Sequence, residues 1–158
     1  MSVPLSSVPL HIILVEPEIP PNTGSIARLC VASGAALHLI EPLGFSIDER
    51  AVQRAGMDYW KHCRVQTWPS LEACQAGCGA SRYLYLTTKS TRPYWDWRFQ
   101  PGDALVFGRE SRGLPESLLA ANADHCLTIP MNPDARSINL AVSTGIVLYE
   151  AIRQLALD

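Results

Sequence analysis

Short apolar runs alternate with longer amphipathic stretches along most of this chain. Short apolar runs bounded by turn residues are typical of buried strands, which we predict over residues 11–15, 36–40, 83–87, 104–107 and 126–129, with a weaker one over 63–68. Helical periodicity predicts helices over residues 23–33, 48–55, 70–77, 115–121 and 139–156. Repeated strand–helix–strand order indicates an α/β fold, with a parallel sheet that carries helices on both faces.

The first predicted helix has recognisable signals at both ends. Asn22 or Thr23 is expected to be its N-cap, because short polar side chains accept hydrogen bonds from the free N–H groups of a first turn. Gly34 is expected to be its C-cap, because glycine adopts the left-handed conformation that ends many helices.

The last predicted helix is apolar on nearly every side. Its apolar residues are Leu140, Val142, Ile146, Val147, Leu148, Ala151, Ile152 and Leu155, too many to face one sheet. A helix of this kind is buried on more than one side. In a domain of this size we expect a partner subunit to bury the second side of this helix, and we therefore predict a homodimer.

Length and composition fit one globular domain over residues 1–158, with 1–9 as a loose leader. The 158 residues are 47% hydrophobic and 18% charged, with a net charge of −2, which is too apolar and too weakly charged for disorder. The longest apolar stretch, residues 140–149, is about half the roughly 20 residues that a membrane-spanning helix needs. The first residues carry no signal-peptide pattern, so we expect a soluble, cytoplasmic protein.

The five cysteines are expected to be free, mostly buried thiols, because their number is odd and their density is low. A zinc site can be assembled on paper from His62, Cys63, Cys74 and Cys78. The usual two-residue spacing within a cysteine pair is missing, so we predict no metal.

Three polar loops follow predicted strands, at residues 16–24, 108–115 and 129–139. Ligands of α/β proteins usually bind where strands end and loops enter helices. Arginine outnumbers lysine by 11 to 2, and several arginines lie in or near these loops, where they are suited to contact phosphate. Structural roles also explain part of the pattern, since Ser137 or Asn139 would cap the last helix in any case. No dinucleotide-binding fingerprint, P-loop, nucleophile elbow or zinc-protease motif occurs.

Taken together, the three loops resemble the SPOUT class of methyltransferases, which use S-adenosylmethionine. Residues 16–28, 105–114 and 129–139 are similar to its first, second and third motifs in order, spacing and position on the sheet. The similarity is greatest to the small branch that methylates the ribose 2′-hydroxyl of the wobble nucleotide, a cytidine or modified uridine at position 34, in leucine tRNAs. Residues 40–45, 54–59 and 86–89 also resemble that branch. The resemblance implies a C-terminal trefoil knot, which general rules of chain topology would not predict.

The resemblance also implies roles for individual residues. Cofactor contacts are implied at Leu86, Gly108, Ile129 and Ser137, mostly through backbone groups. The catalytic set is Arg28, Asn22, Glu110, Ser137, Asn139 and Tyr149. Contacts to tRNA phosphates are implied for Arg112 and Arg136, with Arg50, Arg54, Lys89 and Arg92 as weaker candidates. Arg109 and residues 141–144 depart from the branch's usual pattern, which bears on substrate preference more than on reaction type.

Arg28 corresponds to the family's proposed activator of the ribose hydroxyl. A guanidinium is too basic to act as a free base, because lowering its pKa from about 13 to about 7 costs some 8 kcal/mol. We expect Arg28 to hold a substrate phosphate and to stabilise the developing alkoxide. The family builds its sites at a dimer interface, in agreement with the predicted homodimer.

Three alternatives remain open at the level of sequence. The first is a methyltransferase of the same fold that acts on another tRNA or rRNA nucleotide; about ten residues precede the first strand and almost none follow the last helix, which favours the branch without RNA-binding extensions. The second is a catalytically silent RNA-binding factor, against which the complete catalytic set argues. The third is a nucleotide-dependent redox enzyme, supported only by the α/β pattern.

Overall fold

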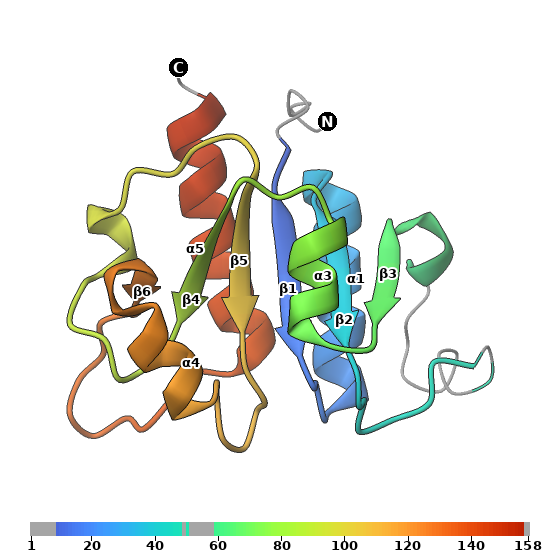
Figure 1. Cartoon of the computed structure of the whole chain (residues 1–158), viewed down its shortest axis with the longest axis horizontal. Helices are drawn as coiled ribbons and strands as arrows, with labels where there is room; N and C mark the ends of the chain where they lie inside the picture. The colour runs from blue at the N-terminus through green and yellow to red at the C-terminus, as the bar shows by residue number, and fades with distance from the viewer. Residues whose placement is uncertain (1–8, 49, 51–58, 157–158) are drawn as a thin grey trace.

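The computed structural model describes residues 9–48, 50 and 59–156, which form one parallel sheet between two layers of helices (Figure 1). The strands are β1 (His11–Val15), β2 (Ala36–Ile40), β3 (Val65–Trp68), β4 (Arg82–Leu86), β5 (Asp103–Phe107) and β6 (Cys126–Leu127). Their order across the sheet is β3-β2-β1-β5-β4-β6, and every neighbouring pair is parallel. The predicted sheet is confirmed: β1 and β2 match at both ends, β4 is shifted by one residue, β5 is one residue longer, and β3 and β6 are two residues shorter than predicted.

Helices cover both faces of the sheet, as predicted. α1 (Pro20–Ser33) and α5 (Leu140–Ala156) lie together behind the sheet in Figure 1, whereas α3 (Leu71–Gly77) and α4 (Glu116–Ala121) lie in front of it. Three 3-10 turns complete the described elements: η1 (Trp60–His62), η2 (Tyr94–Asp96) and η3 (Ala123–His125). The helix predicted over residues 48–55 falls mostly outside the described residues. No helix in the described part of the chain is long and apolar enough to cross a bilayer.

The core divides in two because side chains alternate between the faces of a strand. Ile12 and Leu14 of β1 are fully buried on the face that α1 and α5 cover, where they join Leu148. Ile13 and Val15, the alternate positions of β1, pack instead into a second cluster below α3 and α4. A strand buried on both faces needs an unbroken apolar run, which is the pattern that identified β1 in the sequence.

The start of α1 differs from the prediction. The helix begins at Pro20 and its N-cap is Ile19, with no side-chain capping bond, so the predicted N-cap at Asn22 or Thr23 is wrong. Proline suits a first helical turn because it has no N–H to leave unpaired and its φ is already helical. The predicted C-cap is confirmed, since Gly34 has a φ of 82° and its N–H donates to the Cys30 carbonyl over 2.8 Å.

The strand order positions a site at one end of the sheet. β1 is flanked by β2 on one side and by β5 on the other. The chain connections diverge at such a point and leave a crevice beyond the carboxyl ends of the strands. The loops that follow β1, β4, β5 and β6 all lie at this end, toward which the arrowheads point in Figure 1.

Candidate functional site

A cavity of about 590 Å³ opens beyond the carboxyl ends of β4, β5 and β6. Its wall contains residues from four stretches, 86–89, 107–114, 128–131 and 136–143, together with Ile19 and Asn22 beside the first turn of α1. Small-molecule sites typically have volumes of about 300–1,000 Å³. The cavity therefore has the size and the position that a ligand site in this fold requires.

All four residues predicted to contact a cofactor line this cavity. Leu86 comes from the end of β4, Gly108 and Ile129 follow β5 and β6, and Ser137 lies on the segment that enters α5. The fold thus brings together positions that are far apart in the sequence. Whether they contact a cofactor stays a prediction.

Glu110 ties the loop after β5 to the start of α1. One of its carboxylate oxygens accepts the Glu18 N–H over 2.9 Å, and the other accepts the Ile19 N–H over 2.8 Å. The second oxygen also accepts from the Asn22 side-chain amide over 3.3 Å. A carboxylate held by three donors is a positioning group, because its acceptor sites already serve the fold.

Asn139 extends this network to the third loop. Its side-chain amide donates to the Asn22 side-chain oxygen over 3.0 Å. Its own side-chain oxygen accepts the N–H groups of Ala141 and Val142 over 2.9 and 3.2 Å, which confirms the predicted cap of the last helix. Asn22, Glu110 and Asn139, which the resemblance groups as catalytic, thus form one hydrogen-bonded chain across three loops.

Two further links between the same loops were missed by sequence reasoning. The Glu18 carboxylate accepts the Ser111 hydroxyl over 2.7 Å and the Ser111 N–H over 3.0 Å, and these bonds hold the pKa of Glu18 below its ordinary value. Arg109 pairs with Glu16 over 2.7 Å. Glu16 has a φ of 54°, an uncommon conformation for a residue with a side chain. The sequence marks these residues as loop residues but gives no signal of which acid meets which donor.

The turn after β5 depends on glycine at both ends. Gly113 has a φ of 68°, in the left-handed region that glycine adopts readily. A Cβ built on Gly108 would lie 2.1 Å from the Gly113 carbonyl carbon and 2.3 Å from the Leu114 nitrogen. Gly108 is therefore required by the close approach of the loop's own backbone, which shapes one wall of the cavity.

Arg28 and Tyr149 lie outside the cavity of the chain that carries them. The guanidinium of Arg28, exposed on α1, lies 4.8 Å from the centre of the Tyr59 ring. Tyr149 is 41% exposed on α5. Within one chain the structure does not bring these two members of the predicted catalytic set to the other four.

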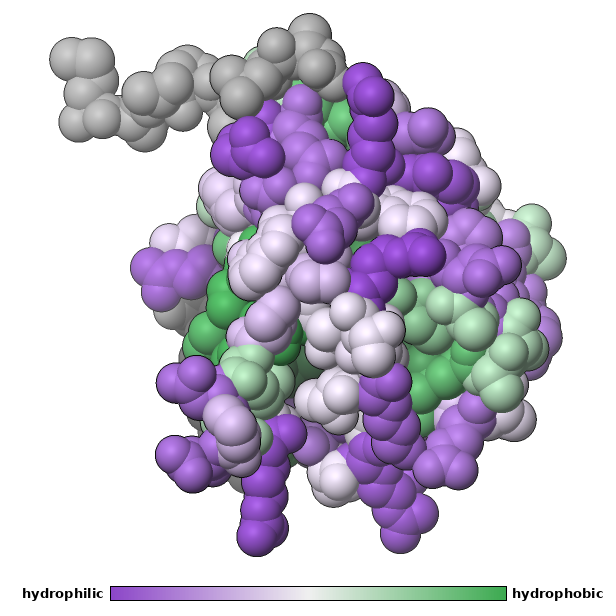
Figure 2. Space-filling view, turned by 90° about the vertical axis from the view of Figure 1, so that its left-hand side faces the viewer, coloured by the Kyte–Doolittle hydropathy of each residue, from purple (hydrophilic) through white to green (hydrophobic). Residues whose placement is uncertain are grey.

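The predicted RNA-contacting residues divide into two groups. Arg112, Arg136 and Lys89 line the cavity and are exposed. Arg92 instead lies over the Trp97 ring and donates to the Asp124 carbonyl. Arg50 is exposed, and Arg54 lies outside the described residues. Figure 2, which views the β6 edge, shows long hydrophilic side chains projecting at the lower end, where the strands terminate in Figure 1.

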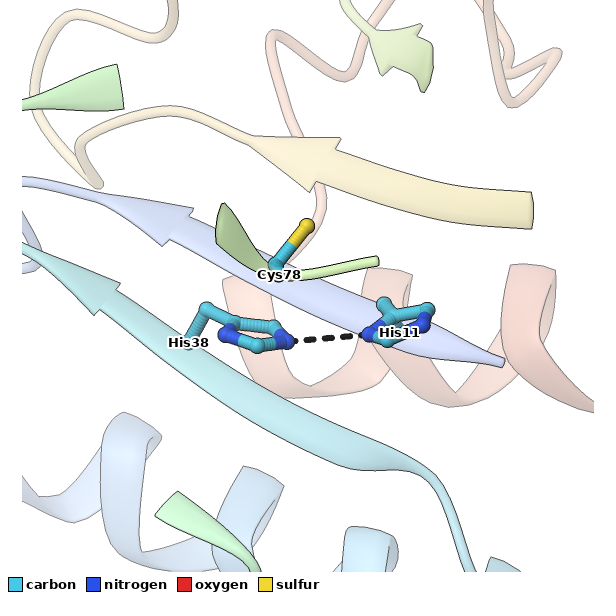
Figure 3. A group of neighbouring side chains, drawn as sticks. All are labelled: His11, His38 and Cys78. Carbon is cyan, nitrogen blue, oxygen red and sulfur yellow. Dashed lines mark hydrogen bonds between the residues drawn. The ribbon is translucent and has the colours of Figure 1, made fainter. Parts of the chain in front are cut away.

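The fold brings together a different group of possible metal ligands from the one considered in the sequence, which was His62, Cys63, Cys74 and Cys78. In the described part of the chain, the ligand atoms of His11, His38 and Cys78 lie within 4.8 Å of one another (Figure 3). The five cysteines are free thiols, with Cys30, Cys74 and Cys126 buried, as expected.

Hydrogen bonding argues against a metal in this group. The Trp68 indole N–H donates to His38 Nδ1 over 3.0 Å, so a neutral His38 carries its proton on Nε2. That proton points to His11 Nδ1, 2.9 Å away. A metal on His38 Nε2 would force the proton onto Nδ1, against the indole N–H. We interpret the group as a hydrogen-bonded part of the core.

Comparison with known proteins identifies the family. Residues 9–149 match the SpoU rRNA Methylase family. The chain belongs to this family. The finding confirms the resemblance drawn from the three loops, and it makes the protein a member of a methyltransferase family.

Individual relatives agree with this assignment. A protein of Methylovorus glucosotrophus named tRNA (cytidine(34)-2'-O)-methyltransferase is 46% identical over 144 residues, covering 90% of this chain and 94% of its own. A structure solved to study 2-OH methylation of C/U34 on tRNA has a TM-score of 0.87 and 42% identity, covering 97% of this chain and 100% of its own. The structure of an AdoMet-bound rRNA methyltransferase from Sinorhizobium meliloti has a TM-score of 0.79 and 26% identity, covering 97% of this chain and 59% of its own.

Proposed function

We propose that this SpoU family member transfers a methyl group from S-adenosylmethionine to the ribose 2′-hydroxyl of the wobble nucleotide, cytidine or modified uridine 34, of leucine tRNAs. S-adenosylhomocysteine is the second product. The observation that carries the proposal is the 46% identity, over nine-tenths of the chain, to a relative named for methylation of cytidine 34. A tRNA substrate agrees with the cytoplasmic location that we propose.

The cavity fits S-adenosylmethionine as its ligand. Leu86, Leu114 and Ile129 give it apolar walls for an adenine ring, and the backbone of the loops around them offers donors and acceptors. The Sinorhizobium relative, which has the same fold, was solved with AdoMet bound. When bound, this cofactor supplies a methyl group on a positively charged sulfur.

The reaction needs a ribose oxygen that gives up its proton as it bonds to the methyl carbon, while the bond from that carbon to sulfur breaks. Glu110 is not the base in this proposal, because both of its oxygens already accept N–H groups. Glu110, Asn22 and Asn139 hold the loops in place around the reacting atoms. Arg28 binds a substrate phosphate and stabilises the alkoxide, and the proton leaves to water.

A second copy of the chain completes the site in this proposal. Val142 and Tyr149 lie seven residues apart on one face of α5 and are 53% and 41% exposed. Leu29 of α1 packs beside α5, near Gly145, so the exposed Arg28 is close to this face. α5 begins at the cavity wall, to which Leu140 and Ser143 contribute. Packing of two copies through α1 and α5 would bring Arg28 of one copy toward the cavity of the other.

We also propose the trefoil knot that the family resemblance implies. Residues 136–143 and 108–114 line the same cavity, so the segment that enters α5 lies beside the loop after β5. Passage of the C-terminal segment through a loop at this point would knot the chain and fix the cavity walls against each other.

The test is methyl transfer from labelled S-adenosylmethionine to total bacterial tRNA and, in parallel, to rRNA, followed by nuclease mapping and by capture of single tRNA isoacceptors. We expect label on the ribose of nucleotide 34 of leucine tRNAs. Label on another nucleotide would refute the position but keep the chemistry. If the protein binds S-adenosylmethionine but labels neither tRNA nor rRNA, a silent RNA-binding role replaces the proposal.

A further inference from the structure

A second, smaller cavity of about 330 Å³ lies beside the first. The two cavities share Lys89 and four residues of the loop after β5, namely Arg109, Arg112, Gly113 and Leu114, so this loop forms a wall between them. Glu16 and Glu116 line only the smaller cavity. A group bound there would be the direct neighbour of a group bound in the first cavity.

The charges around the smaller cavity are three cations and two carboxylates. Arg109 and Glu16 form a half-buried pair, with side chains 35% and 23% exposed. Lys89 and Glu116 form an open pair 2.8 Å apart, with side chains 56% and 84% exposed. Arg112 makes no hydrogen bond or ion pair with any described residue, although its charge, like that of Arg109, acts on the nearby Glu18 carboxylate, which Ser111 holds by two hydrogen bonds. The lining therefore keeps one cation in excess of its carboxylates.

We infer that the smaller cavity binds an RNA phosphodiester group next to the ribose held in the first cavity, an inference that rests on the proposed function. Arg112 supplies an unpaired planar fork of donors, which matches the oxygens of a phosphate. Lys89 supplies a second positive charge once it leaves Glu116. Exposed ion pairs contribute little net free energy because solvent screens them, so a phosphate can displace the Glu116 carboxylate.

Glu116 then acts as a competitor for the phosphate at Lys89. The two ion pairs differ in how easily the carboxylate can leave its cation. Glu16, the partner of Arg109, is mostly buried and has an uncommon backbone conformation, with a φ of 54°. Glu116, the partner of Lys89, is the most exposed of the four paired side chains. Loss of the Glu116 charge should strengthen RNA binding, and the gain should depend on Lys89. If the Lys89–Glu116 pair only stabilised the fold, loss of the Glu116 charge would weaken RNA binding or leave it unchanged.

The experiment measures binding of purified bulk bacterial tRNA by filter retention, at several KCl concentrations and with S-adenosylhomocysteine present. We expect Glu116→Gln to bind tRNA several-fold more tightly than wild type at low salt. Glu72→Gln, which removes an exposed carboxylate of α3 that lines neither cavity, should leave affinity unchanged. In a Lys89→Gln background, Glu116→Gln should give no gain. Arg112→Ala should lower the slope of log K against log salt by about 0.7–0.9, the share of one phosphate contact.

Glu116 does not line the first cavity, so Glu116→Gln should bind S-adenosylmethionine as wild type does. If wild type methylates tRNA but Glu116→Gln and Glu72→Gln bind tRNA alike, the subsite is refuted and the proposed function stands. A gain from Glu116→Gln that persists without Lys89 also refutes it. If wild type binds S-adenosylmethionine but no tRNA at any salt concentration, both proposals fail.

Discussion

The side-chain amide of Asn139 donates to the side-chain oxygen of Asn22 over 3.0 Å, although 117 positions separate the two residues in the chain. Asn22 in turn donates to Glu110, whose carboxylate receives the backbone N–H groups of Glu18 and Ile19. Three loops that follow three different strands are thereby joined by one line of hydrogen bonds. Asn22, Glu110 and Asn139 all line the cavity, so this line of hydrogen bonds links parts of its wall.

Glu110→Gln tests the centre of the network. The amide keeps the size of the carboxylate but replaces one acceptor by a donor, which would face the N–H group of Glu18 or Ile19, just before α1. We expect the free energy of unfolding to fall by about 1–3 kcal/mol, because a backbone donor loses a charged acceptor. Methyl transfer should fall as the loops separate. Urea unfolding at fixed protein concentration and the labelled-methyl assay measure the two effects, with Glu72→Gln, on the exposed face of α3, as the control. Unchanged stability would contradict the positioning role of Glu110.

Gly108→Ala tests the turn that forms the cavity wall. Its added Cβ would lie 2.1 Å from backbone carbon, a distance that only a shift of the loop can relieve. We expect a loss of about 1–3 kcal/mol or more in the free energy of unfolding and weaker binding of S-adenosylmethionine by calorimetry. Gly145→Ala is the matched control, because its Cβ would meet Leu29 at an ordinary 3.8 Å. That helical substitution should stabilise the protein by about 0.5–1 kcal/mol. Equal effects of the two substitutions would rule out the proposed steric role.

The sequence was sufficient to predict the sheet and the loops that line the candidate site. Unbroken apolar runs such as β1 identify strands buried on both faces, and the polar loops that follow them indicate the carboxyl end of a parallel sheet. The cap by Asn139 was also predictable, because capping is decided within one turn of chain. These features all depend on residues that are close in sequence.

The features that the sequence could not predict depend on distant residues. No local pattern pairs Glu18 with Ser111 or His38 with Trp68, since each contact forms only after the strands are in register. The start of α1 was placed too late because Asn22 was expected to act locally as a cap, whereas it bonds across the loops to Glu110 and Asn139. The sequence also could not show that Arg28 lies outside the cavity of its own chain, over the Tyr59 ring, because this depends on how α1 packs in the fold.

The burial of His38 should make the free energy of unfolding fall in acid. Burial, with the charges of His11 and Arg64, lowers the pKa of His38 to about 4, below the ordinary 6.5. The unfolded chain therefore takes up this proton first as the pH falls. The stabilisation from neutral His38 is complete above about pH 6.5 and is lost progressively as the pH falls toward about 4, by roughly 3 kcal/mol in all. Burial also lowers the pKa of His11, which adds in the same direction.

Urea unfolding at pH 7.5, 5.5 and 4.5 measures this loss. His38→Gln should flatten the pH dependence between 6.5 and 4, even if the variant is less stable at pH 7.5, because the titrating group is gone. His62→Gln, at an exposed histidine of η1, should keep the wild-type dependence. The same slope in wild type and His38→Gln would show that other groups cause the acid sensitivity.

If Arg28 acts in the cavity of the partner copy, two inactive variants should restore activity when they are combined in one dimer. Under the proposed pairing through α1 and α5, a copy with Arg28→Ala keeps an intact cavity, and a copy with Gly108→Ala keeps an intact Arg28. Co-expression of the two copies with different affinity tags, and purification through both tags, yields dimers in which one cavity faces a normal Arg28. We expect methyl transfer to return in these mixed dimers, although each variant alone is inactive.

Tyr149→Glu should prevent the recovery and shift the sedimentation of the protein toward the monomer, because it places a charge within an apolar contact. If the mixed dimers form but stay inactive, Arg28 serves the cavity of its own chain, and the cation–π contact with Tyr59 must open to let it reach there.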